Sequence, residues 1–412
     1  MSNVIQKHFS VTIFISALML RLVIAALFGD ATNPQLWEFG SVAKNIVNGT
    51  GFMVPYNFKM AGNAYSIILP TAYMLPLYIL MIAFFFWIFE VGHTAFVSLL
   101  IVQALMGAAS ATLLYFIVYK MFRQIAVARY AALICVLYPP FLYAAIDFGS
   151  TTLYIFLLGI LWWTTLQTDK NESIALAVTG GLIAALLSLT RGEGIFIAGG
   201  VMLWFFLKIS VKQALIFFCF LLIGILPWII RNYITFDKII PLTSTSGMNF
   251  WRGHNPIATG TGREYSGEGI WGTPEMSARL DTVIPDRFYE VKCDRLYFTD
   301  ALSFIREHPR EEVMLCLRKA AFFWGLDVTH PRAKSFPYIL SWGGVLLLGL
   351  FGLYHALHDH QDIWLLAAFY LTMTFVTILF FVLPRYQIIL AYGLIPVSAY
   401  GLWKILHREI RL

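Results

Sequence analysis

The residues of this chain that could do chemistry are a few charged side chains placed next to long apolar stretches. They are Asp30, Glu38, Asp147, Arg191, Glu193, Arg231, Lys319 and Arg385. A charge beside hydrocarbon costs free energy unless it is paired or has a function, so each position carries information. Arginine can hold a phosphate through two parallel hydrogen bonds and stays charged at any working pH. A carboxylate in the same place can accept a proton from a hydroxyl group.

Three of the arginines stand where an apolar stretch ends. Arg191 lies in a polar break between two stretches, Arg231 follows Trp228, and Arg385 follows Pro384. Because they come from three separate stretches, they could converge on one anion, and a lipid phosphate is a natural partner at this depth. We therefore predict that Arg191, Arg231 and Arg385, together with Lys319, bind a donor phosphate. The alternative for each residue is snorkelling to lipid headgroups or pairing with a neighbouring helix end.

Glu38 lies in a segment that predicts a short amphipathic helix on the membrane surface. Apolar residues recur on one face from Trp37 to Val47, and Gly49 and Gly51 follow as stop signals. We expect Glu38 to be the catalytic general base at the bilayer surface. The alternative is a solvated acid on the polar face of that helix.

A loop rich in turn formers supplies the remaining candidates. Residues 247–256 are predicted to cover a substrate through Trp251, Arg252 and His254. Glu193 and Tyr386, next to two of the arginines, are assigned to the same substrate site. The alternative is a structured turn that makes no contact with a substrate.

The composition explains why so few charges are present. Hydrophobic residues make up 59% of the 412 residues and charged residues 13%, against roughly 45–50% and roughly 25% in soluble domains. The apolar blocks are near the ~20 residues that a helix needs to cross ~30 Å of hydrocarbon. This excludes a soluble enzyme and predicts an all-α polytopic membrane protein. The basic residues are scattered rather than gathered on one face, so we expect no nucleic-acid partner.

The four cysteines have no zinc-binding spacing, and we predict neither a metal nor a cofactor. Cys135 and Cys219 lie inside apolar stretches, where a thiol behaves as a small hydrophobe. Cys293 and Cys316 lie in or beside a long polar segment. They could form a disulfide if that segment faces an oxidising compartment.

Ten stretches are predicted to span the membrane. They are residues 9–29, 94–118, 125–146, 149–168, 173–190, 194–209, 212–231, 337–357, 362–382 and 386–405. The first lacks the cleavage site of a signal peptide and is expected to remain as a span. Basic residues mark the inner side in 120–129, at Lys170, in 208–212, in 404–411 and at Lys7. They share one side only if residues 30–93 begin and end on the other.

This topology makes residues 69–89 a re-entrant or interface-lying element, with Pro70 and Pro76 disturbing a continuous helix. It leaves two outer segments, 30–93 and 232–336. The second begins with turns and continues as an amphipathic helix from about Asp294 to Phe323. The chain is thereby divided into a transmembrane module 1–231, an outer segment 232–336 and C-terminal helices 337–412.

Several segments in this order resemble the lipid-dependent GT-C glycosyltransferases, in the group of protein O-mannosyltransferases, aminoarabinose transferases and rhizobial lipopolysaccharide core transferases. The segments are residues 37–40, 43–46, 49–52, 70–78, 189–191, 227–232, 247–256 and 384–386. The resemblance implies seven spans before a large outer loop, with interface helices in the first outer loop. One position departs from the pattern. Many members have an Asp about eight residues before the alanine that matches Ala43, where this chain has Gln35.

The resemblance implies transfer of a sugar from a polyprenyl-phosphate donor to a hydroxyl on a glycan, lipid or protein acceptor. The site would lie on the periplasmic side of a bacterial inner membrane. We expect direct, inverting displacement, with Glu38 taking the proton and the arginines stabilising the leaving phosphate. Membrane lipids would surround the bundle, and the groove at 69–89 would hold the prenyl tail. The alternatives are a transporter or lipid flippase, a scaffold subunit of an envelope assembly, and a polymerase or ligase that uses diphosphate-linked donors.

Overall fold

The computed structural model describes residues 2–60, 63–168 and 174–408. The predicted inner-side residues Lys170 and Arg411 lie outside this range. The apolar helices of the bundle are α1 (Ser2–Phe28), α4 (His93–Phe122), α5 (Ile125–Leu137), α6 (Pro139–Ile146), α7 (Thr151–Gln167), α8 (Ile174–Ser188), α9 (Gly194–Lys208), α10 (Val211–Phe236), α15 (Phe336–His358), α16 (Trp364–Leu379) and α17 (Pro384–Arg408). The other elements are α2 (Trp37–Val47), β1 (Met53–Met60), β2 (Asn63–Pro70), α3 (Pro76–Phe89), α11 (Ser246–Gly253), α12 (Pro274–Asp281), α13 (Tyr289–Glu307), α14 (Pro309–Trp324) and a 3₁₀ turn (Pro331–Lys334).

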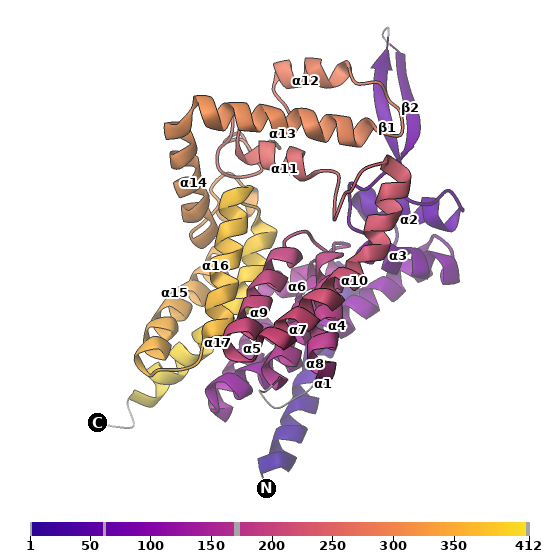
Figure 1. Ribbon diagram of the computed structural model, residues 1–412. Helices are drawn as coiled ribbons and strands as arrows, with labels where there is room; N and C mark the ends of the chain where they lie inside the picture. The colour runs from indigo at the N-terminus through magenta and orange to yellow at the C-terminus, as the bar shows by residue number, and fades with distance from the viewer. Residues whose placement is uncertain (1, 61–62, 169–173, 409–412) are drawn as a thin grey trace.

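The long apolar helices form a bundle that has both chain ends at one side and α11, α12, α13 and the β1–β2 hairpin at the other (Figure 1). Within the described residues, five helices are long and apolar enough to cross a membrane: α1, α4, α10, α15 and α17. The bent pair α5–α6 could make a sixth span, and α7, α8, α9 and α16 are shorter apolar helices. All ten predicted spans are thus helical, and the chain is an integral, multi-pass membrane protein.

The predicted span 125–146 is not one straight helix, which corrects the prediction. It breaks at Tyr138 into α5 and α6, which are bent by 49°. Tyr138 has extended backbone angles, φ −66° and ψ 111°. Proline at 139 disfavours the helical conformation at the residue before it and removes a backbone hydrogen-bond donor.

The first outer segment contains two helices and a hairpin. Helix α2 ends as predicted, with Gly49 and Gly51 at φ +83° and +82°, a conformation that glycine adopts without a steric cost. Strands β1 and β2 pair antiparallel from Met53↔Pro70 to Met60↔Asn63, and this hairpin was not predicted. Residues 69–89 therefore comprise the end of a strand, a turn and the 14-residue helix α3, which is short of the ~20 residues of a span.

The second outer segment is built on α13 and α14, with α11 and α12 packed beside α13 (Figure 1). The amphipathic helix predicted from Asp294 to Phe323 begins earlier, at Tyr289, and breaks at His308. Pro309 starts the next helix because its fixed φ suits a first helical position and its missing N–H is not needed there. Cys293 on α13 and Cys316 on α14 are free thiols, so the possible disulfide is not formed.

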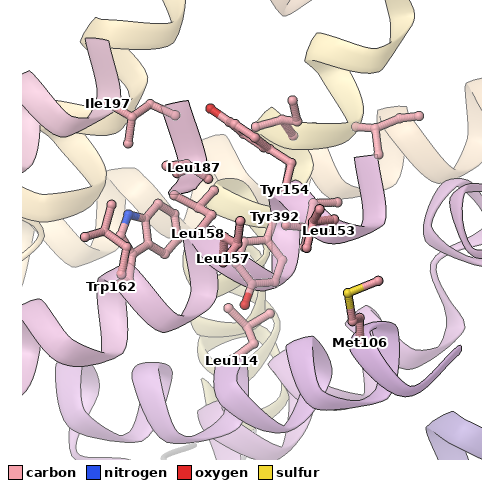
Figure 2. Close-up of a cluster of buried hydrophobic side chains, with 14 of the residues drawn as sticks. Met106, Leu114, Leu153, Tyr154, Leu157, Leu158, Trp162, Leu187, Ile197 and Tyr392 are labelled. Atoms are coloured by element: carbon pink, nitrogen blue, oxygen red, sulfur yellow. The ribbon is translucent and has the colours of Figure 1, made fainter. Parts of the chain in front are cut away.

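Large apolar side chains from α4, α7, α8, α9 and α17 fill the centre of the bundle (Figure 2). Trp162 stacks on Tyr392 with ring centroids 5.8 Å apart. Helices α15 and α17 approach closely at Gly352, where an added Cβ would lie 1.8 Å from the carbonyl oxygen of Val397. Small residues allow such contacts between membrane helices, where packing rather than water exclusion drives association. The bundle is thereby a fixed base for the outer elements.

Candidate functional site

A cavity of about 190 Å³ lies between α2, β1 and the turn that follows β2. Its lining consists of Glu38, Val42, Val54, Pro55, Tyr56, Thr71, Tyr73 and Met74. Glu38 is exposed, and among the described residues its carboxylate has no hydrogen bond or ion pair within the protein. A carboxylate held at a cavity wall without a partner is available to a ligand.

Tyr73 connects Glu38 electrostatically to two arginines. Burial raises the pKa of Tyr73, as does the carboxylate of Glu38, whereas Arg252 on α11 and Arg385 on α17 lower it. Arg385 is exposed, while Arg252 is buried between the rings of Trp271 and Phe381, 4.4 and 4.6 Å from its guanidinium carbon. The site therefore combines one acid with two cations from distant parts of the sequence.

The two guanidinium groups interact unfavourably. Burial lowers the pKa of Arg252 to about 10, and the positive charge of Arg385 contributes to that lowering, although Tyr73 opposes it. Arg252 Nη2 donates to the carbonyl oxygen of Gly262 at 2.8 Å, and its Nε is buried without a hydrogen-bond partner among the described residues. Two neighbouring cations of this kind are stabilised by an anion between them.

Arg231 is committed to the backbone of the first outer segment. Its Nη1 donates to the carbonyl oxygen of Thr71 at 2.7 Å and its Nη2 to that of Phe52 at 3.0 Å. The guanidinium also lies over the rings of Phe52 and Trp228. This arginine holds the turn after β2, which carries Tyr73, in place. A donor phosphate would have to share it with these contacts.

Arg191 is paired within its own turn. Its Nε lies 2.5 Å from Oε1 of Glu193, and both side chains are buried. The guanidinium carbon of Arg191 lies 5.6 Å from the ring centroid of Tyr386 and 5.7 Å from that of Tyr154. The structure therefore brings Arg191, Glu193 and Tyr386 together, as a neutral pair packed between two rings at the outer ends of α7, α9 and α17.

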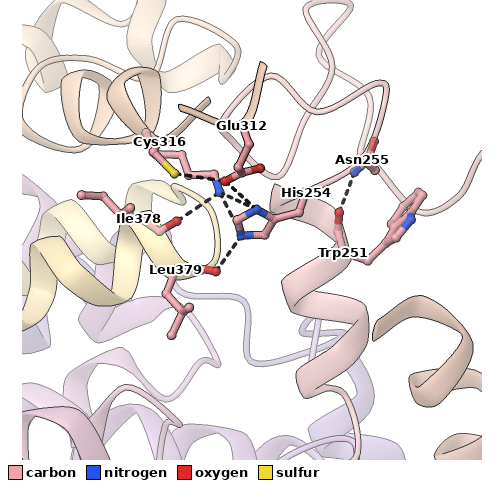
Figure 3. Close-up of polar contacts among 8 residues, drawn as sticks. Trp251, His254, Asn255, Glu312, Cys316, Ile378 and Leu379 are labelled. Carbon is pink, nitrogen blue, oxygen red and sulfur yellow. Dashed lines mark hydrogen bonds and ion pairs between the residues drawn. The ribbon is translucent and has the colours of Figure 1, made fainter. Parts of the chain in front are cut away.

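Lys319 lies in a buried polar cluster with His254, whose neighbours Glu312, Ile378 and Leu379 are labelled in Figure 3. Its Nζ is 3.1 Å from Nε2 of His254 and donates to the carbonyl oxygen of Ile378 at 3.1 Å. His254 Nδ1 lies 2.9 Å from Glu312, and its Nε2 lies 2.9 Å from the carbonyl oxygen of Leu379. Lys319 is completely buried. The cluster joins α11 and α14 to the last turn of α16, and so fixes Arg252 relative to the connection that leads to Arg385.

The charge of Lys319 gives the structure a pH dependence. Burial lowers the pKa of Lys319 to about 8, from an ordinary value of 10.5. Between these values the unfolded chain binds more protons than the folded one, so the free energy of unfolding rises with pH. From pH 8 to pH 9.5 the gain is about 2 kcal/mol. We expect the melting temperature of the purified protein to rise relative to that of Lys319→Met over this interval.

The measurement is thermal unfolding in detergent at pH 7.5, 8.5 and 9.5. Lys292→Met is the control, because Lys292 is partly exposed and pairs with Asp286 on the surface. Parallel pH profiles for the wild type and Lys319→Met would contradict the assignment.

The predicted substrate loop, residues 247–256, comprises most of the helix α11 and the three residues after it, and its side chains have different surroundings. Trp251 is fully buried in the small outer core with Ile270, Met276 and Tyr297, and its Nε1 donates to Asp300 at 2.8 Å. It therefore stabilises the outer layer and does not line the cavity. Of the three loop residues, Arg252 is the one linked to Tyr73 and Arg385.

The remaining outer acids have local roles. Asp30 accepts hydrogen bonds from the backbone N–H groups of Thr32 and Asn33 at 2.9 and 3.0 Å, which forms a turn. Asp147 ends α6, and its carbonyl oxygen accepts from Gln103 at 3.2 Å. Neither lines the cavity that contains Glu38.

Three residues that line the cavity, Tyr56, Thr71 and Tyr73, were not predicted. Glu290 on α13, which accepts hydrogen bonds from the hydroxyl groups of Tyr56 and Thr71, was not predicted either. Thr71 and Tyr73 lie in segment 70–78, so the resemblance contained a signal for them. Glu290 had none, because it stands among other charges at the start of an amphipathic helix. Within the described ranges, no group of three or more His, Cys, Asp or Glu side chains is arranged to hold a metal ion.

No protein-family model and no curated protein sequence matches this chain. The fold is similar to that of the Archaeoglobus fulgidus oligosaccharyltransferase tethered to an acceptor peptide, with a TM-score of 0.60, 13% identity, 98% of this chain covered and 50% of that one. For the same archaeal enzyme in complex with an inhibitory peptide and a dolichol-phosphate, the TM-score is 0.57 and the identity 13%. That match covers 98% of this chain and 51% of the enzyme. The chain thus spans about half the length of this enzyme.

The match to ArnT from Cupriavidus metallidurans bound to undecaprenyl phosphate covers 99% of this chain and 77% of the ArnT chain, at 11% identity. Its TM-score of 0.40 is too low to show a shared fold. At 13% identity, the match to the archaeal oligosaccharyltransferase establishes the fold. The chain therefore shares its fold with about half of this archaeal oligosaccharyltransferase.

Proposed function

We propose that this protein transfers a sugar from a polyprenyl-phosphate donor to a hydroxyl acceptor at the outer face of a membrane. The observation that carries the proposal is the arrangement around Tyr73, which is coupled to the carboxylate of Glu38 and to the guanidinium groups of Arg252 and Arg385. Transfer of a sugar from a phosphate ester needs a carboxylate and a cation. One takes the proton of the attacking hydroxyl, and the other stabilises the charge that develops on the leaving phosphate.

In the proposed reaction, the acceptor oxygen attacks the anomeric carbon and the bond from that carbon to the phosphate oxygen breaks. Glu38 accepts the hydroxyl proton, and the electron pair of the broken bond stays on the polyprenyl phosphate. Attack from the side opposite the phosphate inverts the anomeric configuration. Arg385 is the exposed cation that can meet the phosphate, and the buried Arg252 adds positive charge to the site. Arg191, Arg231 and Lys319 act at a distance by holding the elements around this centre.

The prenyl tail would lie against α3. Its apolar side chains Leu80, Phe84 and Trp87 are 46%, 53% and 73% exposed, and α3 packs next to α2, which carries Glu38. Dolichol-phosphate, present in one structure of the archaeal oligosaccharyltransferase, is a lipid of the same chemical class. We propose that the sugar-bearing face lies on the extracytoplasmic side of a bacterial inner membrane, opposite the basic connections.

The test combines lipid identification with a transfer assay. We expect a polyprenyl monophosphate, with or without a sugar, to co-purify with the protein and to be detected by mass spectrometry. A labelled polyprenyl-phosphate sugar should then lose its label to a hydroxyl acceptor in the presence of the protein. Movement of a glycolipid across vesicles without any sugar transfer would contradict the proposal and favour a transporter.

A further inference from the structure

Glu290 is a buried carboxylate that gathers four hydrogen bonds behind the wall of the cavity. Its Oε1 accepts from the hydroxyl groups of Tyr56 and Thr71, the latter at 2.5 Å. Its Oε2 accepts from the backbone N–H of Ala72 at 2.8 Å and from the hydroxyl of Ser244 at 2.5 Å. The side chain thereby ties α13 to β1, to the turn after β2 and to the segment before α11.

The direction of these hydrogen bonds follows from the donor set. The N–H of Ala72 can only donate, and an ionised carboxylate can only accept. The positive charge of Arg231 lies close enough to interact with the carboxylate of Glu290. Tyr56 and Thr71 must therefore direct their single hydroxyl hydrogens at Glu290. What each hydroxyl can still offer is a lone pair.

Both hydroxyl-bearing side chains line the cavity, together with Glu38. The backbone N–H of Tyr73 donates to Thr71 Oγ1 at 2.9 Å, so the oxygen of Thr71 already acts as an acceptor. With Glu38 also an acceptor, these three side chains give the wall hydrogen-bond acceptors and negative charge, and Tyr73 is the lining side chain with a hydroxyl hydrogen to donate. A phosphate placed against it would find no donor from these three side chains and would be repelled by Glu38.

We propose that Glu290 is a specificity-determining residue that fixes the hydroxyl groups of Tyr56 and Thr71 as acceptors, so that the cavity binds the donor-rich hydroxyl groups of a carbohydrate. The phosphate of the lipid then belongs outside the cavity, at Arg252 and Arg385. That this carbohydrate is the acceptor rests on the proposed function. The polarity of the cavity does not.

Glu290→Gln tests whether the hydroxyl groups of Tyr56 and Thr71 act as acceptors toward the cavity, and it changes the shape of the side chain little. The N–H of Ala72 cannot accept, so the oxygen of the new amide must take the Oε2 position and its NH₂ the Oε1 position. The two amide hydrogens then point at the hydroxyl oxygens of Tyr56 and Thr71. In this variant both hydroxyl groups accept from the amide, and their own hydrogens are free to turn toward the cavity.

The probes are methyl α-glucopyranoside and its fully O-methylated form, which accepts hydrogen bonds but has no hydroxyl to donate. Binding to the purified full chain is measured by saturation-transfer NMR, without a lipid donor. We expect the wild type to bind the free glycoside more tightly by about 10-fold, the effect of one or two hydrogen bonds. In Glu290→Gln this preference should fall about 3-fold or more. Glu307→Gln, at the exposed end of the same helix, should keep it.

Tyr56→Phe is the second variant, because it removes one acceptor and leaves Glu290 with three of its four donors. It should weaken binding of the free glycoside by about 2- to 10-fold. Equal binding of both probes by the wild type, or a preference unchanged in both variants, would overturn the inference. Because the probes need no donor, a cavity with this preference but without sugar transfer would contradict the proposed function and leave the polarity of the cavity standing.

Discussion

Glu38→Gln is expected to lower the rate of sugar transfer by about 10²–10⁴-fold, the usual contribution of a general base. Glutamine has nearly the same shape and cannot take the proton of the acceptor hydroxyl. The substitution should lower kcat and leave KM unchanged, because the proton moves in the transition state and does not move when the substrates bind. The measurement is turnover of a labelled polyprenyl-phosphate sugar by the purified protein.

The control for this variant is its thermal stability. Glu38 is exposed and makes no side-chain hydrogen bond among the described residues, so the melting temperature should not change. Glu307→Gln makes the same replacement at an exposed position on α13 and should keep full activity. Turnover of Glu38→Gln close to that of the wild type would remove Glu38 from the mechanism.

Arg385→Gln is expected to weaken binding of the lipid donor by about 10- to 150-fold, which corresponds to the ~1.5–3 kcal/mol of a hydrogen bond to a charged group. The loss should appear in KM for the donor and, because charge grows on the leaving phosphate, also in kcat. Arg385→Lys should recover part of the binding, since lysine keeps the charge but not the bidentate geometry. Donor affinity is measured with the intact polyprenyl-phosphate sugar.

Arg287→Gln is the matched control for a lost outer arginine. Arg287 pairs with Asp237 on the surface, and the two side chains are 53% and 62% exposed, so the pair contributes little to stability. Its loss should leave donor affinity unchanged. Equal donor affinity of Arg385→Gln and the wild type would rule out the phosphate-binding role of Arg385.

The arginines show how contact partners separate similar sequence signals. Arg191, Arg231 and Arg385 each follow the same pattern of a basic residue at the end of an apolar stretch, and the sequence grouped them. The structure gives Arg191 a buried carboxylate partner and Arg231 two backbone carbonyl groups, and it leaves Arg385 exposed. A sequence pattern reports that a charge lies near a membrane boundary. It does not report how many of its hydrogen-bond donors are already in use.

The sequence by itself determined the apolar bundle, the ten apolar helical stretches and the short helix that carries Glu38, because hydrophobic length and periodicity are local properties of the chain. The prediction missed the bend at Tyr138, although Pro139 is a local signal for it. The sequence did not determine the β1–β2 hairpin or the place of Glu290. The hairpin and Glu290 depend on contacts between separate segments, such as the hydrogen bond of Glu290 on α13 to Thr71 after β2. Only the tertiary structure decided which charges pair and which remain free for a ligand, since pairing depends on distances that the order of residues does not contain.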